Sequence, residues 1–344
     1  MSRVDLSGST DEVVASVRAW LDAADDEPVV VATSGSTGDP KRVVLSRRAV
    51  LASVTATERR LGGPGRWLLA LPATYVAGLQ VVTRSLSAGH APVLLEDHGS
   101  VAEAAAAVDL DFVSLVPTQL HRMLDDDEET AALRSLRTVL LGGGPIETGL
   151  RERAAAAGVS VVATYGSAET AGGCVYDGVA LDGVALKVGA DGRLLVAGPV
   201  LFDGYDGDPV LTAESLVDGW FRTSDAARVD EDGRLQVLGR LDDVVVTGGV
   251  NVPGPAVARR LRDHPQVRAA EVLGVPDPEW GNRLVAYVVP EAGVPGLDQL
   301  RDFVAEVHPR SWGPRQLVVL TSMPMLANGK PDRVQLRALA QAPS

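Results

Sequence analysis

Short apolar segments alternate with alanine-rich helical segments through the first half of this chain, and this alternation restricts the fold more than any other feature. The apolar segments are too short for buried helices, and several end in glycine or proline. Strands are expected at 29–33, 42–46, 67–72, 91–96, 112–117, 136–145 and 159–166. Helices are expected at 11–24, from Ser46 to about Leu61, at 101–110, from about Thr118, and up to Ala157. Such an order is typical of a mostly parallel α/β sheet.

The second half of the chain has a different sequence pattern. From about residue 174, short alternating segments are separated by Asp-Gly pairs, which indicate hairpins and a small β-rich subdomain. The order helix, strand, strand, helix, strand follows Arg240 and suits a separate α+β domain. We therefore predict an α/β protein in which an N-terminal domain, residues 1–241, is hinged to a small C-terminal domain, residues 242–344.

Length and charge exclude several classes of protein. The 344 residues exceed what one compact core usually holds. A formal net charge of −13 repels phosphate backbones, so neither nucleic acid nor an anionic membrane is an expected partner. The single cysteine, Cys174, excludes an intramolecular disulfide. No apolar run is long enough to span a membrane and the N-terminus lacks a secretion signal, so we expect a cytoplasmic protein without membrane insertion.

Lysine is scarce. The chain has only Lys41, Lys187 and Lys330, against 29 arginines. Codon bias accounts for much of this, yet arginine replaces a surface lysine easily and replaces a compact point charge in a tight anion site poorly. Each remaining lysine is therefore of interest, and two of the three lie beside glycine and proline in loop-like sequence.

The segment TSGSTGDPK, residues 33–41, is a candidate phosphate-binding loop. It offers backbone N–H groups, hydroxyls and Lys41 within nine residues. It is not a Walker A loop, because Lys41 lies three residues after Gly38 and β-branched residues follow instead of a helix. The alternative is a plain Ser/Gly hairpin.

Five ordered motifs resemble those of the adenylate-forming superfamily, which includes acyl- and aryl-CoA synthetases, luciferases and adenylation domains of peptide synthetases. They are SGSTGDPK (34–41), TYGSAET (164–170), WFRTSDAA (220–227), GRLDDVVVTGGVNVPG (239–254) and MLANGKPDR (325–333). Ala168 stands where threonine is usual, and Ser224 stands where glycine is usual. The resemblance implies that ATP and a carboxylic acid form an acyl-adenylate, and that coenzyme A then displaces AMP to form a thioester.

The resemblance also assigns roles in the N-terminal part. Lys41 and the phosphate loop would bind the triphosphate, the loop residues being Thr33, Ser34, Gly35, Ser36, Thr37 and Gly38. Glu169 would hold Mg²⁺, with Gly166 and Thr170 beside it. Tyr165 would stack on the adenine, and a glycine turn would let the backbone approach it, formed by Gly142, Gly143 and Gly144.

The remaining roles fall towards the C-terminus. Asp225 would accept hydrogen bonds from the ribose hydroxyls, with Arg240 beside the ribose or the α-phosphate. Asp242 matches the hinge position. Lys330 would serve adenylation, and the second half-reaction would use the turn on the coenzyme A side, formed by Thr247, Gly248 and Gly249.

Another region of the sequence suggests which carboxylic acid is the substrate. LPATYVAGLQVVTRSLSAGH, residues 71–90, resembles the acyl-pocket motif, with Tyr75 where histidine is usual, Gly78 conforming, and Arg84 nine residues after Tyr75. An arginine at this spacing and the VTGGVNVP segment resemble o-succinylbenzoate–CoA ligases of menaquinone biosynthesis, in which arginine would pair with the second carboxylate. The phosphate loop begins at Thr33, so most of the usual N-terminal subdomain is expected to be missing, which favours a homodimer. Alternatives are another aryl- or acyl-CoA ligase, an adenylation domain that loads a carrier protein, and a non-catalytic relative.

Overall fold

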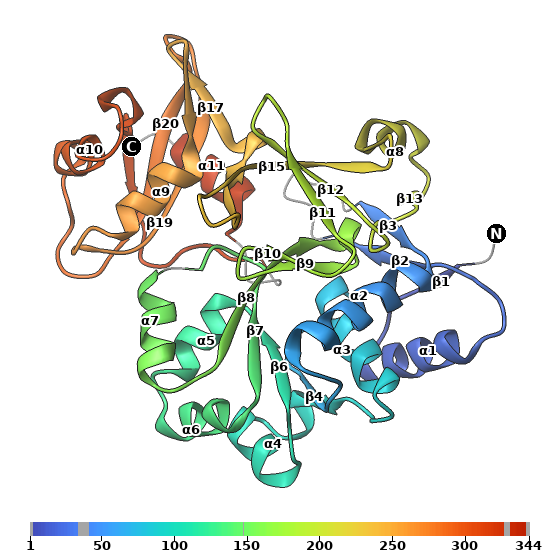
Figure 1. Cartoon of the computed structure of the whole chain (residues 1–344). Helices are drawn as coiled ribbons and strands as arrows, with labels where there is room; N and C mark the ends of the chain where they lie inside the picture. The colour runs from blue at the N-terminus through green and yellow to red at the C-terminus, as the bar shows by residue number, and fades with distance from the viewer. Residues whose placement is uncertain (1–2, 34–40, 147, 327–330, 342–344) are drawn as a thin grey trace. The chain divides into compact units, whose positions relative to one another are not determined.

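A computed structural model of the chain describes residues 3–33, 41–146, 148–326 and 331–341 (Figure 1). The chain forms two compact units. The first comprises residues 1–187, 195–223 and 229–235, and the second comprises 188–194, 224–228 and 236–344. Among the described residues, no helix combines the length and the hydropathy needed to cross a membrane.

A seven-stranded sheet is the centre of the first unit (Figure 1). Its order is β10-β9-β8-β7-β6-β4-β5, and the five strands from β8 to β5 run parallel. The strands are β4 (Trp67–Leu69), β5 (Val93–Leu94), β6 (Phe112–Leu115), β7 (Thr138–Leu141), β8 (Val161–Ser167), β9 (Gly172–Tyr176) and β10 (Val179–Ala180). The predicted α/β class with a mostly parallel sheet is therefore confirmed.

Helices cover both faces of this sheet. They are α1 (Thr10–Asp22), α2 (Arg47–Leu61), α3 (Val76–Ser87), α4 (Val101–Ala107), α5 (Pro117–Met123), α6 (Asp127–Ser135) and α7 (Thr148–Ala156), with short 3₁₀ turns at Leu95–Asp97 and Ala168–Thr170. Successive strand residues point to opposite faces. On β6, Phe112 joins the apolar cluster under α1 to α3, and Val113 joins the cluster under α4 to α7. The strand segments are consequently apolar throughout, as the sequence indicated.

The predicted phosphate loop connects two strands of a smaller sheet. This sheet has the order β1-β2-β3-β13, formed by β1 (Val4–Asp5), β2 (Val29–Ala32), β3 (Arg42–Leu45) and β13 (Gly204–Tyr205). β2 and β3 are antiparallel, and β13 adds to β3 with Tyr205 opposite Val43. The Asp203-Gly204 pair was expected to form a hairpin turn, and this expectation was wrong because Gly204 lies within β13.

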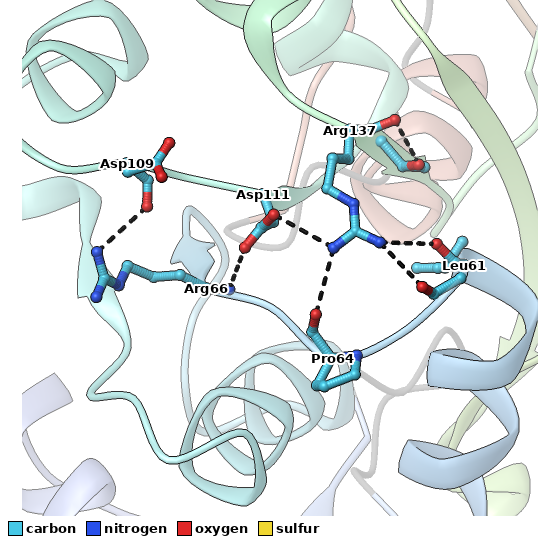
Figure 2. Close-up of polar contacts among 8 residues, drawn as sticks. Leu61, Pro64, Arg66, Asp109, Asp111 and Arg137 are labelled. Atoms are coloured by element: carbon cyan, nitrogen blue, oxygen red, sulfur yellow. Dashed lines mark hydrogen bonds and ion pairs between the residues drawn. The ribbon is translucent and has the colours of Figure 1, made fainter.

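The N-terminal ends of β6 and β7 are tied to the loop after α2 (Figure 2). The Arg137 guanidinium donates to three backbone carbonyls, those of Leu61, Gly62 and Pro64, at 3.4, 3.2 and 3.3 Å. Asp111 accepts from the Arg66 backbone N–H at 2.8 Å and from Arg137 at 3.3 Å. In α/β sheets ligands bind at the opposite, carboxyl ends of the strands, so this network holds the fold together away from the site.

A third sheet has the order β11-β12-β15-β14, with β16 paired to β15. Its strands are β11 (Ala185–Val188), β12 (Arg193–Ala197), β14 (Leu216–Val217), β15 (Trp220–Val229) and β16 (Leu235–Arg240), and α8 (Pro209–Ser215) precedes β14. Asp218 and Gly219 form the turn between β14 and β15, both with positive φ, as the Asp-Gly pattern predicted. The limits of the two units fall within β11, β12, β15 and β16.

The second unit contains the predicted α+β order. A 3₁₀ turn (Leu241–Asp243) leads into the hairpin β17 (Val244–Thr247) and β18 (Val250–Pro253). Then follow α9 (Gly254–Arg262), β19 (Val267–Asp277), β20 (Gly281–Pro290), α10 (Leu297–Ala305), a 3₁₀ turn (Arg310–Trp312), β21 (Gln316–Val319) and α11 (Arg333–Gln341). The helices α3, α8 and α11 were not anticipated from the sequence. The exact domain boundary at residue 241 stays a prediction.

Candidate active site

The base of the predicted phosphate loop is closed by two hydrogen bonds. The Thr33 N–H donates to the Lys41 carbonyl at 2.8 Å, and the Lys41 N–H donates to Thr33 Oγ1 at 3.1 Å. The Thr33 hydroxyl therefore already has a protein partner. The predicted residues Ser34, Gly35, Ser36, Thr37 and Gly38 lie outside the described residues.

Glu169 lies just past the carboxyl end of β8 and is only 9% exposed. Its Oε1 accepts a 2.9 Å hydrogen bond from the Tyr205 hydroxyl. The Lys41 ammonium lies 5.1 Å from the centroid of the same tyrosine ring. The structure thus brings together the predicted cation and the predicted carboxylate, and it adds Tyr205, which the sequence analysis missed.

The surroundings of Glu169 fit a magnesium ion that arrives with its nucleotide. Within the described part of the chain, no group of three or more His, Cys, Asp and Glu side chains is placed to hold a metal. Mg²⁺ commonly binds through one or two carboxylates together with substrate phosphates and water. A single buried carboxylate that shares the neighbour Tyr205 with a lysine is consistent with that arrangement.

The glycine turn predicted near the adenine follows β7. The Gly142 N–H donates to the Leu115 carbonyl at 3.1 Å, and a Cβ at Gly142 would lie 2.3 Å from Thr164 Oγ1. Gly143 has a positive φ of 79°, and Gly144 has open space around it. Glycine is therefore favoured at Gly143 by the backbone conformation and at Gly142 by the closeness of the Thr164 side chain, and the adenine contact remains a prediction.

The motif at the end of β8 mixes structural residues with candidate ligands. A Cβ at Gly166 would lie 2.0 Å from the Gly172 carbonyl oxygen, so glycine permits the close pairing of β8 with β9. The buried Thr170 hydroxyl accepts from the Ser167 N–H at 2.9 Å and donates to the Gly172 carbonyl at 2.7 Å. Thr170 thus fixes the turn that carries Glu169. Tyr165 lies on β8 and makes contacts within the protein.

The three predicted acid-pocket residues all belong to α3 or its cap. Tyr75 is the half-buried N-cap residue. A Cβ at Gly78 would lie 2.2 Å from the Pro72 carbonyl oxygen, so Gly78 lets the helix pack against the preceding backbone. Arg84 is 3% exposed.

The Arg84 guanidinium is surrounded by protein groups. Nη2 donates to Thr57 Oγ1 at 3.2 Å and to Tyr176 Oη at 3.4 Å, and the group lies 4.9 Å from the Trp67 ring centroid. Nε has no partner among the described residues. Burial raises the pKa of the neighbouring Glu58 carboxyl, and the charge of Arg84 opposes that rise. Sequence reasoning did not anticipate these internal contacts, and binding of the acid by Arg84 remains a prediction.

Cys174 is fully buried in β9. Burial raises the pKa of its thiol to about 11. A thiol in that state is a poor nucleophile at neutral pH.

The second unit carries the remaining predicted residues. Asp225 is half-buried on β15 and Arg240 is half-buried at the end of β16, and both have partners within the protein. Asp242 lies in the 3₁₀ turn that precedes β17. Lys330 lies outside the described residues.

The predicted turn on the coenzyme A side connects β17 to β18. Gly248 and Gly249 both have positive φ, of 55° and 77°, as a two-residue hairpin turn requires. The Gly248 N–H donates to the Trp280 carbonyl at 3.0 Å, and a Cβ at Gly248 would lie 2.7 Å from the Trp280 ring. Thr247 is buried, and its Oγ1 has no partner among the described residues.

The first unit is an α/β fold in which Glu169 and the glycine turn at 142–144 follow the carboxyl ends of β8 and β7, the edge at which such sheets bind ligands. The chain belongs to the AMP-binding enzyme family: the family signature matches residues 7–206, and the signature of the C-terminal domain of AMP-binding enzymes matches residues 257–330.

Individual members of the family indicate which AMP-binding enzymes this chain is similar to. The chain is 42% identical over 337 residues to a probable 2-succinylbenzoate–CoA ligase of Mycobacterium tuberculosis, covering 95% of this chain and 88% of the relative. It is 34% identical over 312 residues to a feruloyl-CoA synthase of Amycolatopsis, covering 79% and 64%. The o-succinylbenzoate CoA synthetase of Bacillus subtilis, solved with its acyl-adenylate, superposes with a TM-score of 0.79 at 29% identity, covering 90% of this chain and 68% of that one. That protein has also been solved with ATP and a magnesium ion.

Proposed function

We propose that this protein is a 2-succinylbenzoate–CoA ligase of menaquinone biosynthesis. In the first half-reaction a carboxylate oxygen of the acid attacks the α-phosphorus of ATP, giving acyl-AMP and pyrophosphate. In the second, the coenzyme A thiol attacks the acyl carbon, AMP leaves, and the thiol proton is released. The main support is the 42% identity to the Mycobacterium relative over almost the whole length of both chains.

The residues of the first unit suit the first half-reaction. The acid and the triphosphate repel each other, so a cation must offset that repulsion. Lys41 at the base of the loop supplies a positive charge, and Glu169 supplies a buried carboxylate for the magnesium ion that accompanies ATP. The ion, when bound, neutralises phosphate charge.

The residues of the second unit divide between the two half-reactions in this proposal. Asp225 accepts from the ribose hydroxyls, and Lys330 stabilises the charge that develops during adenylation. The turn at 247–249 takes part in the second half-reaction, in which the coenzyme A thiol attacks acyl-AMP. Residues 242–344 would then act as a mobile domain about Asp242, and the protein would work as a cytoplasmic homodimer.

The similarity to feruloyl-CoA synthase favours one second candidate, an aryl-CoA ligase that acts on a monocarboxylic acid. The two candidates differ in whether the acid carries a second carboxylate. An arginine can pair with that group in a two-pronged geometry, which is the reason for retaining Arg84 as a candidate.

Pyrophosphate release tests the proposal directly. Pyrophosphate release is measured with purified protein, ATP, Mg²⁺ and one acid at a time. The acids compared are 2-succinylbenzoate, ferulate, benzoate and a medium-chain fatty acid. We expect kcat/KM to be at least tenfold higher for 2-succinylbenzoate, and thioester to form only when coenzyme A is present. A higher value for ferulate would favour the second candidate. Acyl-AMP that accumulates and is not consumed by coenzyme A would indicate a carrier-protein acceptor.

A further inference from the structure

We propose that Tyr205 is a positioning residue for the magnesium–ATP complex, because it contacts both Lys41 and Glu169. This inference rests on the proposed function, since it assumes that those two residues bind the triphosphate and its metal ion. Tyr205 does not need to touch the reacting atoms. It acts by fixing the two charged side chains.

The position of Tyr205 is strongly constrained. β13 pairs with β3, which places Tyr205 opposite Val43 and near Lys41 in the small sheet. The ring is 7% exposed and packs edge-on against Phe202, with centroids 4.9 Å apart. The Phe202 N–H donates to the Glu169 carbonyl at 3.0 Å, so the segment that carries the tyrosine is also attached to the backbone of the glutamate.

Different parts of Tyr205 contact the two charged groups. The hydroxyl donates to Glu169 Oε1 at 2.9 Å, inside a region where both side chains are buried. A hydrogen bond of this kind fixes the rotation of a carboxylate, and such partners of metal-binding carboxylates strongly affect metal affinity. The ring face lies 5.1 Å from the Lys41 ammonium, within the range of a cation–π contact. One side chain thereby orients a carboxylate and a cation.

Because the hydroxyl contacts Glu169 and the ring contacts Lys41, two variants can separate the two contacts. Tyr205→Phe removes the hydroxyl and keeps the ring, whereas Tyr205→Leu removes both contacts. ATP is titrated into each protein by calorimetry over a series of Mg²⁺ concentrations. The Mg²⁺ midpoint is the Mg²⁺ concentration at which half of the Mg²⁺-dependent gain in ATP affinity is reached. For Tyr205→Phe we expect this midpoint to rise about ten- to a hundredfold, because loss of a hydrogen-bond partner of a metal ligand typically lowers metal affinity by that factor. For Tyr205→Leu we expect ATP binding to weaken further, including at the lowest Mg²⁺ concentration.

The matched control is Tyr287→Phe in the second unit. The Tyr287 hydroxyl is also buried and has no partner among the described residues. Its removal should leave the Mg²⁺ midpoint within twofold of wild type. Thioester formation from synthetic acyl-adenylate, which needs no triphosphate, should stay within threefold of wild type in Tyr205→Phe.

Two results would overturn the proposal. One is an unchanged Mg²⁺ midpoint in Tyr205→Phe. The other is an equal loss of both half-reactions with a lowered melting temperature, which would make Tyr205 a packing residue. The calorimetric titration does not depend on the acid, so a wild-type protein that fails to use 2-succinylbenzoate would refute the proposed function and leave the test of Tyr205 intact.

Discussion

Arg333 Nη1 lies 2.6 Å from Asp243 Oδ1 in the second unit, although the two residues are 90 positions apart in sequence. Arg333 also contacts Glu271 Oε1, at 3.0 Å from Nε and 2.9 Å from Nη2. Asp243 directly follows the predicted hinge residue, and Arg333 lies three residues after Lys330. The ion network therefore connects the segment of the hinge with the segment of the predicted catalytic lysine.

Arg333→Ala should destabilise the protein at pH 7 by about 3–5 kcal/mol, because it leaves two largely buried carboxylates without their cation. The check is urea unfolding of the full chain. Arg301→Ala is the control, since the exposed Arg301–Asp298 pair should contribute at most about 1 kcal/mol. Similar losses in the two variants would contradict this prediction.

The same network predicts a dependence on pH. Burial raises the pKa of Glu271 above 4.5, and Arg333 opposes that rise. A carboxyl with a raised folded-state pKa binds its proton more tightly when folded, so its contribution to stability falls as pH rises from 4.5 through the folded pKa. Without Arg333 the pKa should rise further. The difference in unfolding free energy between Arg333→Ala and wild type should thus shrink on acidification from pH 7, and a constant difference would refute this reading.

Lys330→Ala should abolish adenylation and largely spare thioester formation from acyl-adenylate, because the lysine is proposed to serve only the first half-reaction. Pyrophosphate release and thioester formation are measured separately. Lys187→Ala, on the exposed side of β11, should change neither rate. An equal loss of both activities in Lys330→Ala would contradict its assignment.

Asp225→Ala should raise the KM for ATP about ten- to a hundredfold. Removing a charged acceptor from the ribose hydroxyls costs about 1.5–3 kcal/mol. The KM for the acid should change much less, and steady-state kinetics with each substrate varied in turn provide the comparison. An unchanged KM for ATP would remove Asp225 from the nucleotide site.

Arg84→Ala should lower kcat/KM for 2-succinylbenzoate about ten- to a hundredfold, as expected for loss of a charge-assisted hydrogen bond of about 1.5–3 kcal/mol. An aryl monocarboxylate of similar shape should be affected far less. Arg84 also bonds Thr57 and Tyr176, so thermal unfolding is measured in parallel. If kcat/KM falls by the same factor for both acids, Arg84 acts by holding α2, α3 and β9 together.

Local sequence indicated most of the strands and several of the helices of this protein. Ser46 was expected to cap a helix that ends near Leu61, and its hydroxyl accepts from the Ala49 N–H at the start of α2. Continuous apolar segments indicated strands buried on both faces. Capping and periodicity depend on residues only a few positions apart, so they are visible without tertiary contacts. The motifs likewise singled out Lys41, directly before β3, and Glu169, just after β8.

Tertiary structure decided which side chains meet. Tyr205 reaches Glu169 only because β13 pairs with β3, more than 150 residues earlier in the chain. Arg84 had the spacing of a substrate ligand, and the packing of α3 against α2 and β9 surrounds its guanidinium with protein groups. Contacts of this kind depend on strand order and helix packing, which emerge from the whole apolar core. No local pattern around Tyr205 or Arg84 encodes them.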